Sequence, residues 1–192
     1  MASDTERLLA YLGQIPEPAA EPAFIVVSGL PGTGKSYFSK RLAERLPLVI
    51  MESDSLRKIL FPEPVYSQEE SSYLFRICHG LIEFLLKKGI SVVLDATNIS
   101  EKNREYLYHI SERLAIKLIL IRIVAPQKVV QERLLARAHI KSNRSDADWA
   151  VYQRMKSEED RITRNHYVVD TSGDITPVIN RIIKDITRKR RK

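Results

Sequence analysis

The chain contains little cysteine and no long apolar run. Cys78 is the single cysteine among 192 residues, so no disulfide can form within the chain. No apolar run approaches the roughly 18 residues that a membrane-spanning helix needs, and the first residues, MASDTERLL, lack the apolar centre of a signal peptide. These absences predict a cytoplasmic protein with no membrane partner.

Signals for guanine binding and for a histidine-bound metal are also absent. No Asn-Lys-x-Asp segment occurs in the chain, which disfavours a GTPase. The four histidines show no metal-ligand spacing with one another, so we assign none of them a role. The sequence carries no signal of its oligomeric state.

Positive charge is concentrated near the C-terminus. The net charge is +7, and residues 181–192 contain seven Lys or Arg and one Asp, so the rest of the chain is nearly neutral. We expect residues 188–192 to form a basic tail. Three interpretations of the tail stay open: solvated charge, help in holding a polyanion such as nucleic acid, or a localisation signal.

Short apolar runs alternate with helical patterns after residue 23, which is typical of βαβ units around a buried parallel sheet. Strands are expected at residues 24–28, 48–52, 91–95, 117–123 and 167–169. Helices are expected at residues 35–46, 68–88, 101–114, 127–139 and 149–161, with a last amphipathic helix between Ile175 and Ile186. Residues 1–22 are expected to form a helix that begins at Ser3 and a proline-rich linker.

The segment GLPGTGKS, residues 29–36, lies between the first expected strand and a helix. Its spacing fits the P-loop, in which backbone N–H groups surround the phosphates of a nucleotide at a helix N-terminus. In this motif Lys35 contacts the β- and γ-phosphates of ATP, and the Ser36 hydroxyl binds Mg²⁺. The expected nucleotide contacts are Gly29, Leu30, Pro31, Gly32, Thr33, Gly34, Lys35, Ser36 and Tyr37.

A carboxylate ends the third expected strand, SVVLD. Asp95 would hold Mg²⁺ directly or through water, because P-loop enzymes place an acidic residue at such a strand end. The alternative is an Asp that caps a helix or a turn. A kinase and an ATPase would both use Asp95, so this residue does not separate them.

The second expected strand leads into ESDSLR, where Asp54 and Arg57 lie three residues apart at the start of a helix. In a P-loop sheet this strand ends on the side of the cleft where a phosphate acceptor binds. Asp54 could take the proton of an acceptor hydroxyl, and Arg57 could hold the acceptor or neutralise charge on the phosphoryl group. A helix cap with an i,i+3 ion pair explains the same pattern.

Taken together, GLPGTGKS, SDSLR, VVLDATNISEKNR and RLLAR with NRSDADW resemble the P-loop kinases of the AAA_33 and zeta-toxin-like group, typified by phage polynucleotide kinase. The resemblance covers about residues 24–172. It implies a three-layer α/β fold with a five-stranded parallel sheet in the order 2-3-1-4-5, a kinase domain at residues 23–187 and a small lid at about residues 138–148.

The resemblance also implies roles for individual residues. Asp54 matches the general base and Arg57 the arginine on the acceptor side. Arg133 and Arg137 lie four residues apart on one helix face and match the lid arginines, although an exposed basic face would look the same, and Arg144 is a further candidate. The segment beside the acceptor corresponds to Asp95, Thr97 and Asn98, followed by Arg104.

We therefore expect transfer of the γ-phosphate of ATP·Mg²⁺ to a hydroxyl group. The acceptor is either the 5′-hydroxyl of a polynucleotide or a small molecule such as a sugar, nucleoside or antibiotic, and the sequence leaves both open. The alternative is a P-loop ATPase that acts as a regulatory or toxin-like switch without a hydroxyl acceptor.

Overall fold

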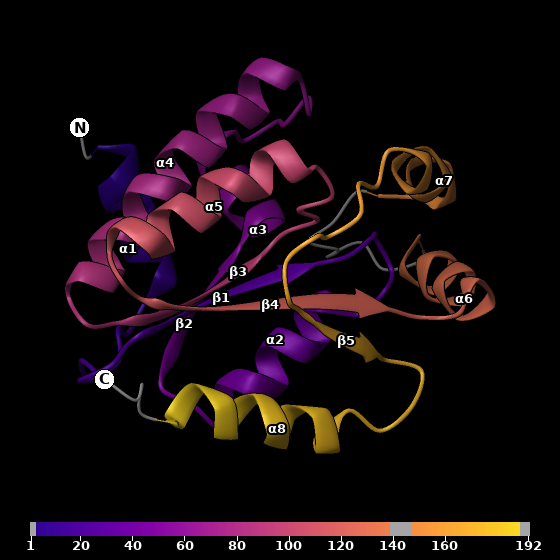
Figure 1. Cartoon of the computed structure of the whole chain (residues 1–192). Helices are drawn as coiled ribbons and strands as arrows, with labels where there is room; N and C mark the ends of the chain where they lie inside the picture. Colours follow the sequence, from indigo (N-terminus) through magenta and orange to yellow (C-terminus); the bar gives the residue numbers. More distant parts are fainter. Residues whose placement is uncertain (1–2, 139–146, 189–192) are drawn as a thin grey trace.

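Five parallel strands form the central sheet of the computed structural model, which describes residues 3–138 and 147–188 (Figure 1). The strands are β1 (Ala23–Ser28), β2 (Leu48–Glu52), β3 (Ser91–Asp95), β4 (Lys117–Val124) and β5 (Tyr167–Asp170). Their order is β2-β3-β1-β4-β5, and every neighbouring pair is parallel. The predicted strands, their order and the α/β class are confirmed.

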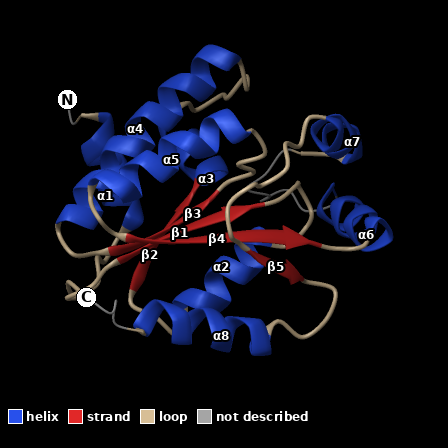
Figure 2. Ribbon diagram, in the orientation of Figure 1, coloured by secondary structure: helices blue, strands red, loops and turns tan. Residues whose placement is uncertain are grey.

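Helices cover both faces of this sheet (Figure 2). They are α1 (Asp4–Leu12), α2 (Lys35–Ala43), α3 (Ser53–Leu60), α4 (Gln68–Lys87), α5 (Glu101–Arg113), α6 (Gln127–Ala138), α7 (Trp149–Ser157) and α8 (Thr176–Thr187). α1, α3, α4 and α5 lie on one face and α2 and α8 on the other, while α6 and α7 lie beyond the carboxyl end of β4. The sheet is therefore the middle of three layers.

The central strand β1 is buried along its whole length, which explains why it is apolar at every position except its last. Side chains alternate between its two faces: Phe24 and Val26 join the core under α4 and α5, whereas Ile25 and Val27 join the core over α2 and α8. The sheet thus separates two hydrophobic cores.

The first helix is fastened to the α4 side of the molecule. Its predicted start at Ser3 is confirmed by a capping box, in which the Ser3 hydroxyl accepts from the backbone N–H of Glu6 and the Glu6 carboxylate accepts from the backbone N–H of Ser3. Leu8 is fully buried in the core, and Asp4 accepts a hydrogen bond of 2.6 Å from the Tyr73 hydroxyl. That hydrogen bond, with help from Arg7, lowers the pKa of Asp4.

Two predicted helices end early: α2 ends at Ala43 rather than at residue 46, and α7 ends four residues before its predicted end. α7 stops at Ser157, whereas the sequence predicted a helix to residue 161. Beyond it, the Asp160 N–H donates to the Ile99 carbonyl, and the carbonyls of Asp160 and Arg161 accept from Arg104. These backbone groups are satisfied by other parts of the chain, so the segment does not continue the helix.

Most of the expected lid, residues 139–146, lies outside the described residues, and so do Arg144 and residues 189–192 of the expected basic tail. Among the described residues, no helix combines the length and the apolar character that crossing a membrane requires.

Replacing Leu8 with alanine tests whether α1 is part of the folded core. We expect Leu8→Ala to lower the free energy of unfolding by about 2–5 kcal/mol, because it leaves a cavity in a closed core. Leu135→Ala is the matched control, since Leu135 is 59% exposed and its loss should have little effect. Urea unfolding followed by circular dichroism measures both, and equal effects would contradict the packing of α1.

Candidate functional site

The P-loop joins β1 to α2 at the carboxyl edge of the sheet. Gly34 caps α2 with a φ of 96°, and a Cβ there would lie 2.8 Å from the Thr171 hydroxyl, so glycine is required. A Cβ on Gly29 would lie 2.5 Å from the Ile123 carbonyl oxygen. No side chain caps the N-terminus of α2, which leaves its first N–H groups directed into the loop. This geometry suits a phosphate.

Four charged side chains act electrostatically on the Lys35 ammonium. The ammonium itself donates to the Leu30 carbonyl at 3.2 Å. Burial lowers the pKa of Lys35, and the negative charges of Asp95 and Asp54 oppose this shift. Glu52 opposes it too, while the positive charge of Arg137 adds to it. The structure thus brings four predicted site residues, Lys35, Asp54, Asp95 and Arg137, into one electrostatic environment.

Glu52 is a site residue that the sequence reasoning missed. Its carboxylate accepts from the Ser36 hydroxyl at 2.8 Å and from the Ser55 hydroxyl at 2.7 Å. In this hydrogen bond the Ser36 hydroxyl is the donor. The lone pairs of the Ser36 oxygen can therefore serve as ligands of a cation. A carboxylate as the last residue of an otherwise apolar strand was the signal that could have identified Glu52.

The surroundings of Asp95 suit a magnesium ion. Asp95 is 2% exposed, and its Oδ2 atom has no hydrogen-bond partner among the described residues. Burial raises the pKa of Asp95, and Lys35 partly opposes this effect. A cation would compensate this buried carboxylate, and Mg²⁺ prefers oxygen ligands such as those of Asp95 and Ser36.

A cavity of about 100 Å³ adjoins this position. Its lining residues are Tyr11, Ser36, Lys40, Ile50, Glu52 and Asp95. The described residues contain no group of three or more His, Cys, Asp or Glu that could hold a metal. The protein would therefore supply few of the ligands of Mg²⁺, and substrate and water oxygens would supply the others.

The segment after β3 is bonded to the P-loop strand. The Ser28 hydroxyl donates to the carbonyls of Thr97 and Asn98, and the Gly29 N–H donates to the Thr97 carbonyl. The Asn98 amide donates to the Val27 carbonyl at 2.8 Å. These bonds hold the backbone of Thr97 and Asn98 beside the P-loop, and their predicted contacts with an acceptor stay predictions.

Arg104 is the most deeply buried charged side chain of the predicted set, at 1% exposure. Its guanidinium donates to four backbone carbonyls and to the Glu101 carboxylate. The four carbonyls are those of Asn98, Ile99, Asp160 and Arg161. Arg104 thus joins the segment after β3 to the chain after α7, and its predicted contact with substrate stays a prediction.

The predicted lid arginines occupy different surroundings. Arg133 donates to the Thr171 hydroxyl and carbonyl, both at 2.8 Å, and the Thr171 hydroxyl donates to the Thr33 carbonyl. Arg133 therefore supports the P-loop from α6 through Thr171, which bonds to both. The sequence did not predict this supporting role for Thr171. Arg137 lies one turn further on and contributes charge near Lys35.

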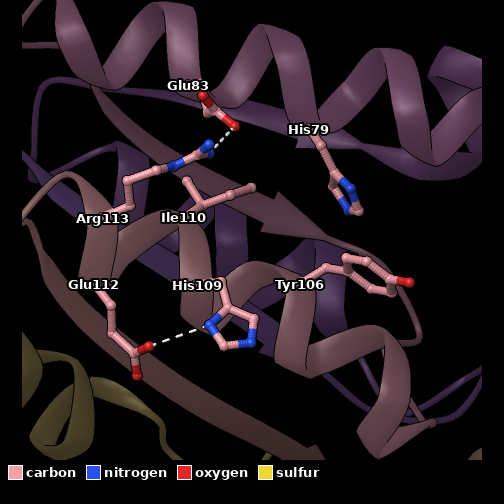
Figure 3. Close-up of a pocket in the computed structure, with 7 residues that line it drawn as sticks. All are labelled: His79, Glu83, Tyr106, His109, Ile110, Glu112 and Arg113. Carbon is pink, nitrogen blue, oxygen red and sulfur yellow. Dashed lines mark hydrogen bonds and ion pairs between the residues drawn. The ribbon is translucent and has the colours of Figure 1, made fainter.

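A second, larger pocket of about 440 Å³ lies between α4 and α5, away from the P-loop (Figure 3). Its lining residues are His79, Glu83, Tyr106, His109, Ile110, Glu112 and Arg113. Polar groups there contact one another: Arg113 forms an ion pair with Glu83, and the His109 ring lies 3.4 Å from the Glu112 carboxylate. No predicted site residue lines it, so size alone does not identify the functional site.

Truncating Arg104 tests its structural contacts. We expect Arg104→Met to lower the free energy of unfolding by about 3 kcal/mol or more, because buried carbonyls and a carboxylate lose their donor. Arg113→Met, at a side chain 62% exposed, is the matched control and should change stability little. Urea unfolding followed by Trp149 fluorescence measures both. A small loss of stability in Arg104→Met would contradict the hydrogen bonds of Arg104 to the four carbonyls and to Glu101.

The lowered pKa of Lys35 predicts a pH dependence of nucleotide binding. Polyphosphate favours the protonated ammonium, so the affinity for ATP should fall as the pH rises through the lowered pKa, by up to about tenfold per pH unit. Calorimetric titration with ATP from about pH 7 to pH 10 measures this fall. In Lys35→Arg the guanidinium stays protonated, so affinity should be independent of pH. The same pH dependence in both proteins would contradict the assignment.

Comparison with known proteins gives the family of this chain. A family model described as an AAA domain, AAA_33, matches residues 24–162. The chain is 28% identical over 118 residues to an L-seryl-tRNA(Sec) kinase of Methanococcus maripaludis, covering 59% of this chain and 45% of that kinase. It is 30% identical over 93 residues to a gluconokinase of Gluconobacter oxydans, covering 45% of this chain and 52% of that enzyme.

The chain thus spans about half the length of the curated relatives it matches. A solved structure with the same fold is that of the APS kinase CysC of Mycobacterium tuberculosis in complex with AMPPNP and APS. The TM-score is 0.67 and the sequence identity 15%, and the match covers 88% of this chain and 98% of that one. Since the family model matches well over half of the chain, the chain belongs to the AAA_33 family of P-loop kinases.

Proposed function

We propose that this protein transfers the γ-phosphate of ATP to a hydroxyl group of its acceptor, with residues 23–187 as the catalytic domain. The observation that carries the proposal is the position of Asp54. This carboxylate lies in the first turn of α3, just after β2, and acts electrostatically on the P-loop lysine, Lys35. In a hydrolase a carboxylate there would activate water, and the kinases among the relatives favour a hydroxyl acceptor instead.

In the proposed reaction the P-loop holds the phosphates of ATP through its N–H groups, and Lys35 contacts the β- and γ-phosphates. Ser36 and Asp95 would hold Mg²⁺, with Glu52 orienting the Ser36 hydroxyl. Bound Mg²⁺ would supply positive charge that neutralises part of the charge of the phosphates.

Asp54 accepts the proton of the acceptor hydroxyl as that oxygen forms a bond to the γ-phosphorus. The bond from this phosphorus to the bridging oxygen breaks, and ADP leaves with the electron pair. Arg137, and Arg133 if it is released from Thr171, offset the negative charge on the transferred group. Positioning and charge neutralisation supply the rate enhancement without a covalent intermediate.

The nature of the relatives supports two classes of acceptor. The names of the gluconokinase and the APS kinase indicate small-molecule acceptors, whereas that of the L-seryl-tRNA(Sec) kinase indicates an aminoacylated RNA. A polynucleotide 5′-hydroxyl, the other acceptor that the sequence leaves open, would make use of the basic residues 188–192. The nearly neutral body of the chain favours a small molecule.

Asp54→Asn tests the proposed base. We expect the rate of transfer to fall by about 100-fold or more, while the affinity for ATP changes little, because the amide cannot accept the proton. The assay uses γ-labelled ATP with Mg²⁺ and a mixed set of 5′-hydroxyl oligonucleotides, nucleosides, sugars and aminoglycosides.

Asp185→Asn is the control, since Asp185 lies beside Lys117 at the amino end of β4. Transfer that survives in Asp54→Asn would contradict the base assignment. Release of free phosphate alone, equal in both proteins, would favour the ATPase alternative.

A further inference from the structure

A buried ion pair connects α3 to α4 beside the proposed acceptor site. The Arg57 guanidinium donates to the Glu70 carboxylate at 2.5 Å, and the two side chains are 8% and 6% exposed. Arg57 also donates to the Ser71 hydroxyl at 3.2 Å. Arg57 is the residue for which the sequence predicted a direct contact with the acceptor, yet its charge is already paired within the protein.

The second oxygen of Glu70 holds the loop between the two helices, residues 61–66, which we name the acceptor loop. It accepts from the N–H groups of Val65 and Tyr66 at 2.8 and 3.2 Å. Tyr66 has a φ of 57°, a strained value for a residue with a side chain, and the Arg57 guanidinium lies 4.9 Å from the centre of its ring. One ion pair therefore fixes the end of the loop in a conformation that it would not adopt alone.

The acceptor loop and the ion pair that holds it carry one net negative charge together. The negative charge of Glu70 cancels the charge of Arg57. Burial of the Glu70 carboxylate raises its pKa, but hydrogen bonds from Arg57 and from the N–H of Val65 lower it more, so the pKa of Glu70 lies below its usual value. The loop itself, FPEPVY, carries one charged residue, Glu63. A phosphate or sulfate against this loop would meet no uncompensated charge from Arg57 and would be repelled by Glu63.

The loop instead exposes apolar surface. Val65 is 77% exposed and Tyr66 is 43% exposed, next to the N-terminus of α4. Exposed side chains of this kind can pack against the ring face of a sugar or a nucleoside.

Building on the proposed function, we propose that the Arg57–Glu70 pair positions the acceptor loop and that this loop receives an uncharged, ring-containing part of a polyhydroxylated acceptor. Glu70 is then a positioning residue, because it acts through the loop and through Arg57. The pair makes the site selective against acceptors that carry phosphate or sulfate at this position.

Matched pairs of acceptors test the charge selectivity. Wild-type protein, γ-labelled ATP and Mg²⁺ are combined with adenosine or adenosine 3′-monophosphate, and with glucose or glucose 1-phosphate. We expect the neutral member of a pair to have a kcat/KM at least about tenfold higher. A higher value for the phosphate-bearing member would overturn the proposal.

Glu70→Gln tests the ion pair, with Glu69→Gln as the matched control in the same first turn of α4, where Glu69 is exposed. We expect Glu70→Gln to raise the KM for the neutral acceptor by about tenfold, because the acceptor loop loses its support, and to leave the KM for ATP unchanged. The preference for the neutral member of each pair should fall, because Arg57 regains a free charge. Glu69→Gln should change none of these. An unchanged acceptor KM in Glu70→Gln would overturn the role of Glu70.

Amide hydrogen exchange at Val65 and Tyr66 measures the loop without an acceptor. We expect faster exchange in Glu70→Gln than in Glu69→Gln, and equal exchange would overturn the positioning of the loop. If Glu70→Gln does not fold, Arg57→Lys replaces it, and faster exchange than in Glu69→Gln is expected again, because a lysine keeps the charge but lacks the forked geometry that bonds to both Glu70 and Ser71. Failure of wild-type protein to phosphorylate any acceptor would reject the proposed function, and the exchange result would still decide whether the pair holds the loop.

Discussion

The partial burial of the Lys35 ammonium is the constraint on which the rest of the site depends. Desolvation of a cation is costly unless negative charge lies close to it, and three carboxylates lie near Lys35: Asp95 is the last residue of β3, Glu52 is the last residue of β2, and Asp54 lies in the first turn of α3. The parallel sheet makes the gathering possible, because its strands all end at one edge. The groups that compensate the lysine are also the ones that a phosphoryl transfer would use.

Much of this arrangement could be predicted because it is local in the sequence. Apolar runs give the strands, and the glycine spacing with Lys35 and Ser36 gives the P-loop. The contacts that the sequence did not reveal join residues far apart in the chain: Arg133 with Thr171, Arg104 with the carbonyls of Asp160 and Arg161, and Arg57 with Glu70. Each partner looks like an ordinary charged or polar surface residue until the fold brings the two together.

Arginines have different roles on the two sides of the P-loop. Arg104 fastens the segment after β3 through backbone carbonyls, Arg57 is matched by a carboxylate, and Arg133 bonds to a threonine that in turn bonds to the P-loop. Arg137, one turn beyond Arg133, acts on Lys35 through its charge. A helical spacing of arginines in a sequence therefore does not tell which of them contacts a substrate, since rigid support and charge neutralisation require the same side chain.

The segment matched by the family, residues 24–162, is smaller than the unit that holds the site together. The elements β5 and α8 follow this segment, and α1 precedes it. Thr171, directly after β5, bonds to the P-loop, and Leu8 of α1 is buried in the core. A fragment cut at the family boundaries would turn β4 into an edge strand with unpaired N–H and C=O groups along an apolar run. Such a fragment would be prone to aggregate through this edge, so fragments for expression need to keep the flanking elements.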